Sequence, residues 1–94
     1  MPPQRYDIYL ARIPYRRADY ARYWVVVNLP SPGAVTLAAL SSQFDLFRPS
    51  QDFEICETDD GFVATGLKKR CFVTTHWVEV DETALLKKKG SITG

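Results

Sequence analysis

The side chains best suited to chemistry lie at the ends of two short apolar runs. Arg22 comes shortly before the run at residues 24–27, and Ser41 follows the run at residues 35–40. An arginine guanidinium stays charged and can donate two parallel hydrogen bonds to an oxyanion, and a serine hydroxyl can donate another. His76 is the only histidine, and imidazole is the side chain that most often transfers protons at neutral pH.

A β-hairpin would bring Arg22 and Ser41 together. Residues 24–27 are all apolar, rich in β-branched side chains and too few for a helix, which indicates a buried strand. Residues 29–33 contain two prolines and a glycine, which are expected to end the ladder, and residues 35–40 resume as a second strand. Because the start of one antiparallel strand lies beside the end of the next, Arg22 and Ser41 are expected at one end of the sheet.

The remaining pattern predicts further short strands. All the expected strands are residues 6–13, 24–27, 35–42, 52–57 and 71–80. In the last of them, the expected core residues are Phe72, Val73, Trp77 and Val78. Alternation along this strand turns His76 away from the core. Residues 58–61 end in Asp-Gly, which predicts a tight hairpin turn.

A short helix is expected after the last strand. Asp81 is a good N-cap, Leu85 and Leu86 would face inward, and Gly90 would end the helix. The three lysines at residues 87–89 fall in its last turn, where they would compensate the helix dipole, and we assign them no function. The prediction is a mainly β fold, a compact barrel or roll with one short helix near the C-terminus.

Composition limits the class of protein. The 94 residues suit one domain, 46% of them are hydrophobic, and no apolar run approaches the length needed to span a membrane. No signal peptide is apparent, so we expect a cytoplasmic location. Cys56 and Cys71 do not form a disulfide framework, and their spacing to His76 is not that of a metal site. A net charge of +1 gives no global indication of nucleic-acid binding.

Four stretches of the chain, taken in order, resemble the PemK/MazF family of toxins from bacterial toxin–antitoxin pairs. They are RYDIYL at residues 5–10, RYWVVVN at residues 22–28, ALSSQ at residues 39–43, and GLKKRCFV at residues 66–73 followed by Val80, Asp81 and Leu85. The first is similar to the family's basic-Gly-Asp/Glu-apolar start. The resemblance lies in the order and spacing of these motifs, which span nearly the whole chain.

The resemblance implies a fold, an activity and two site residues. The fold would be an SH3-like small β-barrel of the PemK/MazF/CcdB type, a single domain over residues 1–94 that forms a homodimer. The activity would be that of a metal-independent, sequence-specific endoribonuclease (an mRNA interferase), which cuts single-stranded RNA through its own 2′-OH and is neutralised by a cognate antitoxin. Arg22 and Ser41 match the family's catalytic pair of an arginine and a threonine or serine. No cofactor is implied.

The chain also departs from the family's pattern. Tyr23 stands where the family has proline, and residues 14–20 replace its glycine-rich loop. Cys71 stands where a serine is usual. Where one branch carries an Arg-x-Asp pair used in cleavage, this chain has Thr74 and His76. Family members usually continue into a C-terminal helix beyond the position of Gly94, the last residue here.

Basic and aromatic side chains supply candidate RNA contacts. A groove for backbone phosphates could be lined by Arg16, Arg17, Lys68, Lys69 and Arg70. Bases could stack on Tyr15, Tyr20 or Tyr23. Ser42 and Gln43 are further candidate RNA contacts. The alternative for the basic turns is that they keep a small barrel soluble. Residues 54–60 form an acidic stretch that reads as a solvated edge and turn.

Each catalytic candidate has an ordinary structural alternative. Arg22 could be a surface residue that flanks a strand, Ser41 could cap its own backbone, and His76 could be a surface or packing residue. The matching alternative for the whole chain is a non-catalytic binding module of the same fold. It would poison gyrase, as CcdB-type toxins do, or bind only an antitoxin or RNA. A third interpretation is an unrelated SH3-like or OB-like adaptor.

Overall fold

The computed structural model of the chain describes residues 2–13 and 21–92. The strands are β1 (Asp7–Arg12), β2 (Ala21–Ser31), β3 (Ala34–Ser41), β4 (Phe53–Ile55), β5 (Cys71–Asp81) and β6 (Leu85–Ser91). The helical pieces are the 3-10 turns η1 (Phe44–Leu46) and η2 (Glu82–Ala84) and the single α-helical turn α1 (Phe62–Thr65). The prediction of a mainly β fold with little helix is therefore confirmed.

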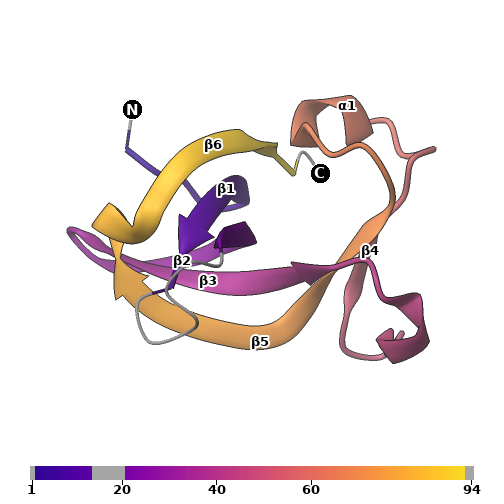
Figure 1. Ribbon diagram of the computed structural model, residues 1–94, viewed down its shortest axis with the longest axis horizontal. Helices are drawn as coiled ribbons and strands as arrows, with labels where there is room; N and C mark the ends of the chain where they lie inside the picture. The colour runs from indigo at the N-terminus through magenta and orange to yellow at the C-terminus, as the bar shows by residue number, and fades with distance from the viewer. Residues whose placement is uncertain (1, 14–20, 93–94) are drawn as a thin grey trace.

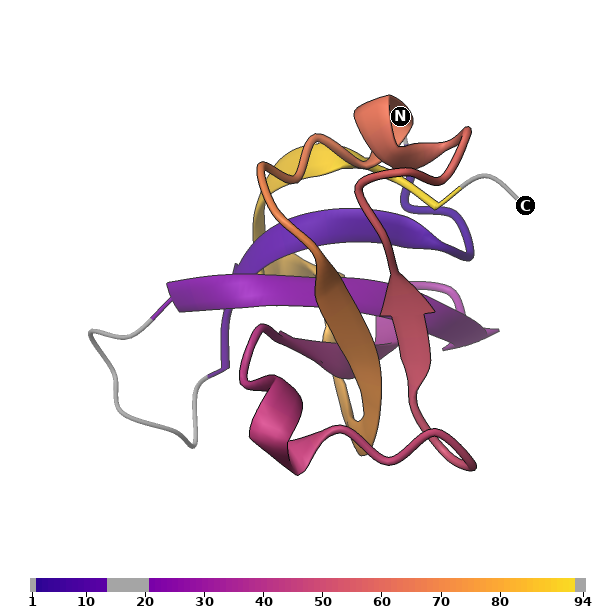
Figure 2. The same ribbon diagram turned by 90° about the vertical axis from the view of Figure 1, so that its right-hand side faces the viewer.

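All six strands form one antiparallel sheet in the order β4-β5-β3-β2-β1-β6. Figure 1 shows the sheet curling, with β6 arching over β1 and β5 running beneath β3. Within the described residues β4 and β6 are the two edges, and no ladder joins them, so the sheet is open. Helix α1 packs on β6 beyond this opening, as Figure 2 shows from the side.

The central hairpin is the part of the fold that the sequence predicts best. In β2 and β3, Trp24 pairs with Ala39 and Val25 with Ala38. The connecting turn is shorter than expected, because β2 continues through Pro30 to Ser31. Two register shifts in β2 let the strand run past its proline, which lacks a backbone N–H to give the ladder.

Apolar side chains pack on both faces of the sheet. One group, the Trp24 cluster, consists of Ala11, Ile13, Trp24, Val26, Val35, Leu37, Ala39 and Val80. The other, the Val25 cluster, consists of Ile8, Val25, Leu40 and Ile55. The alternation of β2 explains the division, because Trp24 and Val26 point to one face and Val25 to the other. Both faces of the hairpin are thereby covered, which fits its unbroken apolar sequence.

The prediction of a helix after the last strand is wrong. The side chain of Asp81 does accept a hydrogen bond from the backbone N–H of Thr83, but it caps only the 3-10 turn η2. The next residues form β6, which pairs with β1 from Ala11–Leu85 to Asp7–Ser91. Pairing with β1 outweighs the local helix signals, and the lysines of residues 87–89 lie on an edge strand instead of a helix end. Lysines on an edge strand discourage pairing with another chain.

Two further expectations about the second half of the chain are wrong. Trp77 is not a core residue, because 59% of its surface is exposed. Of the other expected core residues of β5, Phe72 is buried, whereas Val73 and Val78 are partly buried against the two clusters. Residues 58–61 do turn the chain, with the backbone N–H of Phe62 donating to the carbonyl of Asp59, but the expected hairpin is wrong, since α1 and a further loop separate β4 from β5.

A buried carboxylate fastens the first strand to the last. Asp7 is only 4% exposed, and its Oδ1 accepts a hydrogen bond from Ser91 Oγ at 2.8 Å and lies 3.4 Å from Lys88 Nζ. Its Oδ2 accepts the backbone N–H of Gln4 at 2.9 Å. These contacts satisfy a charge that would otherwise be costly to bury. Among the described helices, none is long and apolar enough to cross a membrane.

Candidate functional site

A concave surface of about 640 Å³ lies at the end of the central hairpin, and we call it the Arg22 pocket. It is lined by Leu10, Arg22, Tyr23, Leu40, Ser41, Ser42, Gln43, Leu67, Lys69 and Cys71. These residues come from β1, β2, β3, β5 and the loops that follow β3 and α1. The pocket therefore gathers Arg22 and Ser41 with four of the predicted RNA-binding residues.

The hairpin register accounts for the meeting of Arg22 and Ser41. The pair Trp24–Ala39 ends the regular β2–β3 register, and Arg22 and Ser41 each lie two residues beyond it. Arg22 is exposed and Ser41 is partly buried. The Oγ of Ser41 accepts the backbone N–H of Gln43 at 3.1 Å. A hydroxyl that accepts one hydrogen bond can still donate its own proton, so Ser41 can offer that proton to an anion in the pocket.

Lys69 and Cys71 line the same pocket from the second half of the chain. The Sγ of Cys71 donates to the backbone carbonyl of Lys69 at 3.4 Å. Burial raises the pKa of the Cys71 thiol, and the charge of Lys69 lowers it by less. The thiol is therefore protonated at neutral pH and can act as a weak hydrogen-bond donor. Lys69 supplies a second cation facing the same space as Arg22.

Lys89 is a residue near this pocket to which the sequence interpretation assigned no role. Its Nζ lies 5.4 Å from the centroid of the Tyr23 ring, within the range of a cation–π contact. Tyr23 lines the pocket and also packs against the Val25 cluster. These contacts hold the Tyr23 ring in place. In the sequence Lys89 is only part of a run of three lysines. Its place beside Tyr23 follows only once residues 85–91 are known to form a strand.

Other candidates lie away from the pocket. The His76 ring lies 6.3 Å from the Trp24 ring, centroid to centroid, and His76 is not among the lining residues. In the β3–β5 ladder Ser41 pairs with Phe72, so His76 lies four residues further along β5. Arg70 lies 3.9 Å over the Phe44 ring and 3.5 Å from Glu54, which gives its charge a structural use.

The remaining basic and aromatic candidates are less informative. Lys68 is exposed next to Lys69 and does not line the pocket. Arg16, Arg17, Tyr15 and Tyr20 lie outside the described residues. Within residues 2–13 and 21–92, no group of three or more His, Cys, Asp or Glu side chains is arranged to hold a metal ion.

No model of a known protein family matches this chain, and no curated protein is similar enough to count as a match.

Proposed function

We propose that this protein is a small endoribonuclease toxin of the PemK/MazF type that binds single-stranded RNA in the Arg22 pocket. The observation that supports the proposal best is the joint placement of Arg22, Ser41 and Lys69 around one concave surface. Two cations and a hydroxyl suit a phosphodiester, because guanidinium and ammonium groups bind its charged oxygens. The resemblance of the sequence motifs in their order is the second support.

In the proposed reaction the 2′-OH of one nucleotide attacks the adjacent phosphorus. The bond from phosphorus to the 5′-oxygen of the next nucleotide breaks, leaving a 2′,3′-cyclic phosphate and a free 5′-OH. The guanidinium of Arg22 would stabilise the charge that gathers on the non-bridging oxygens, and the Ser41 hydroxyl would donate to one of them. Lys69 would hold a neighbouring phosphate.

Proton transfer is the step of the proposed reaction for which the pocket has the fewest suitable side chains. The attacking 2′-OH must lose a proton and the leaving 5′-oxygen must gain one. The described lining residues of the Arg22 pocket include neither a carboxylate nor an imidazole. His76 remains the proposed proton carrier, and in that role it would have to reach the same phosphate that Arg22 and Ser41 hold, although it does not line the pocket.

The proposal extends to the fold and the partners. The open, curled sheet with its first and last strands paired fits an SH3-like small barrel of the PemK/MazF/CcdB type. The proposed partners are single-stranded mRNA, a cognate antitoxin and a second copy of the chain, and the proposed location is the cytoplasm.

Cleavage of a long single-stranded RNA tests the proposal. The purified protein, with EDTA present, is expected to produce discrete fragments that end in a 2′,3′-cyclic phosphate. Arg22→Ala is expected to lower the cleavage rate by about 10²- to 10³-fold, as removal of a charge-stabilising donor does in other enzymes. Arg5→Ala is the matched control, because Arg5 is an exposed arginine that does not line the pocket. Intact RNA across substrates of varied sequence would contradict the proposal.

The described lining of the pocket includes neither a carboxylate nor an imidazole, which favours a second candidate, a non-catalytic binding module. Such a module would bind RNA, an antitoxin or gyrase through the same cations without cutting RNA. Binding of a 2′-O-methyl oligonucleotide, which cannot be cleaved, separates the two functions. Binding that depends on Arg22, together with intact natural RNA, would favour the binding module. Cleavage whose rate falls in His76→Ala while binding of this oligonucleotide is unchanged would favour the enzyme.

A further inference from the structure

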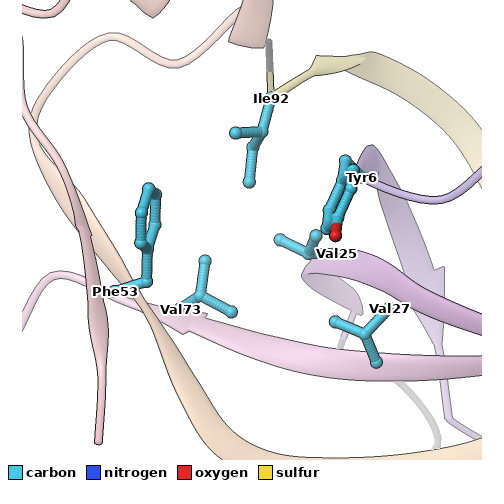
Figure 3. Close-up of a pocket in the computed structure, with 6 residues that line it drawn as sticks. All are labelled: Tyr6, Val25, Val27, Phe53, Val73 and Ile92. Carbon is cyan, nitrogen blue, oxygen red and sulfur yellow. The ribbon is translucent and has the colours of Figure 1, made fainter. Parts of the chain in front are cut away.

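A second concave surface, here the Tyr6 groove, lies elsewhere on the sheet. It has a volume of about 470 Å³ and is lined by Tyr6, Val25, Val27, Phe53, Val73 and Ile92. No lining residue is shared with the Arg22 pocket. Figure 3 shows the rings of Tyr6 and Phe53 on opposite sides of the groove, with Val25, Val27 and Val73 along its floor and Ile92 above.

Both aromatic rings of the Tyr6 groove are largely exposed to solvent. Tyr6 is 53% exposed and Phe53 is 60% exposed. The Tyr6 hydroxyl is the only side-chain polar group among the six lining residues. The described lining of the groove has no charged side chain. A charged group of a ligand would therefore lose water there without gaining an ion pair, which costs free energy. The part of a ligand that fills the groove must therefore be apolar.

The backbone at Tyr6 is held in a conformation that a tyrosine seldom adopts. Its φ is +74°, the left-handed region, and among non-glycine residues of the described chain it is the only one with a positive φ. Its N–H donates to the carbonyl of Val26 at 2.7 Å, and its carbonyl accepts from the N–H of Ile92 at 2.9 Å. The protein thus fixes a strained residue from both sides and places its ring at the wall of the groove. The Tyr6 ring is still half exposed, so burial of the ring does not explain why tyrosine stands at this strained position.

Carboxylates lie just beyond Phe53. Phe53 and Ile92 also line an adjoining hollow of about 450 Å³, whose wall includes Glu54, Asp59 and Asp60. Glu54 is paired with Arg70, and Asp59 Oδ2 accepts the backbone N–H of Cys56 at 2.8 Å. Asp60 is exposed and has no ion pair among the described residues. A ligand that continues from the groove past Phe53 therefore meets negative charge.

We propose that the Tyr6 groove binds a segment of a partner protein in which a bulky apolar side chain lies next to lysine or arginine. The apolar side chain fills the space between Tyr6 and Phe53, and the basic side chain reaches Asp60 and its neighbours in the adjoining hollow. Charge complementarity selects this occupant, because an acidic segment would be repelled by the same carboxylates. The site lies apart from the Arg22 pocket, and the inference does not depend on RNA cleavage.

Selection from a displayed library of random twelve-residue peptides tests the inference. The full chain is the bait, and selections are run in parallel on the wild-type protein and on Tyr6→Gly. Glycine accepts the backbone conformation of residue 6, so this variant removes the ring without strain. The wild type is expected to enrich peptides in which Leu, Ile, Met or Phe lies within a few residues of Lys or Arg, and Tyr6→Gly is expected not to enrich them.

Titration of a synthetic enriched peptide then measures each part of the site. Tyr6→Gly and Phe53→Ala are each expected to weaken binding at least tenfold. Asp60→Asn is expected to weaken it about threefold at low salt and by less at high salt, since the contact is exposed. Leu46→Ala and Asp45→Asn are the matched controls, because both residues are exposed on η1 and line neither hollow, and binding should be unchanged.

Four results would contradict the inference. The first is no enrichment on the wild type, and the second is the same enrichment on Tyr6→Gly. The third is concentration-dependent self-association of the wild type that is lost in Tyr6→Gly and that no enriched peptide disrupts. That result would assign the groove to a second copy of this chain. An enriched set without basic residues would likewise contradict the role of the carboxylates.

Discussion

Tyr6 illustrates how a single residue can oppose the preference of its backbone position. It lies in the turn that the N–H of Asp7 closes on the carbonyl of Gln4 at 3.1 Å, and its φ of +74° suits glycine at that place. The sequence gives no sign of this, because Tyr6 reads as the first residue of a strand. The strain becomes visible only when the contacts to Val26 and Ile92 are known.

The strain at Tyr6 can be measured by comparing two substitutions. Both Tyr6→Ala and Tyr6→Gly remove the ring, but only alanine keeps a Cβ in the left-handed conformation. Tyr6→Gly is expected to be more stable than Tyr6→Ala by about 1 kcal/mol, the reverse of the usual order in a strand or helix. Urea unfolding of the two variants measures the difference. Equal stabilities, or a more stable alanine variant, would show that residue 6 is not strained.

Cys71 provides a second test at the level of one residue. Burial raises the pKa of its thiol, so at any given pH a smaller fraction is the reactive thiolate. In a Cys56→Ser background, its alkylation by iodoacetamide is expected to rise with pH at a higher midpoint than that of a capped, unstructured peptide containing one cysteine. Lys69→Gln removes the charge that partly opposes this effect and should move the midpoint higher still. Mass spectrometry across a pH series measures both, and a midpoint at or below that of the peptide would contradict the assignment.

At the scale of elements, prediction from sequence succeeded where one pattern dominated. The apolar run at residues 24–27 has only one favourable use, a strand covered on both faces, and from it the meeting of Arg22 with Ser41 follows by geometry. Residues 81–90 carry consistent helix signals, yet they form η2 and β6. Pairing of β6 satisfies the backbone hydrogen-bonding groups on the edge of β1 that β2 does not cover. Non-local pairing of this kind leaves no local signal. The positions of Lys89, Trp77 and the Tyr6 groove depend on it and could not be predicted.

The contact between α1 and β6 depends on Gly90. A Cβ at this position would come well inside van der Waals contact with the backbone of Ala64 and Thr65. Gly90→Ala is therefore expected to destabilise the fold by about 2 kcal/mol, since neither backbone can move away without separating the elements. Gly33→Asn is the control, because Gly33 has a φ of +83° but open space around it, and it should cost below about 1 kcal/mol. A loss for Gly90→Ala no larger than for Gly33→Asn would show that α1 does not rest on β6.

At the scale of the whole molecule, the chain carries one concave surface lined by cations and another that adjoins carboxylates. Arg22 and Lys69 face one concave surface, and Glu54, Asp59 and Asp60 line the hollow beside the other. Because they share no lining residue, a substitution in one is expected to leave the other intact. The near-neutral total charge hides this separation, which is why composition alone indicated no partner.

This independence is a prediction about double binding. Arg22→Ala is expected to abolish most binding of a 2′-O-methyl oligonucleotide and leave the affinity for a Tyr6-groove peptide unchanged. Tyr6→Gly is expected to do the reverse, and wild-type protein saturated with one ligand should bind the other within about twofold of its normal affinity. Calorimetric titrations measure each of these affinities. A change of tenfold or more in either cross-measurement would show that the two surfaces communicate.

The pairing of β1 with β6 has a consequence for biosynthesis. Asp7 and Ser91 meet across 84 positions of the chain, so the sheet can be completed only after residues 85–91 have left the ribosome. Until then β1 has β2 on one side and an open edge on the other, and such edges recruit strands of neighbouring nascent chains. The Asp7 carboxylate, exposed and charged at that stage, would oppose unwanted pairing before β6 arrives to cover it.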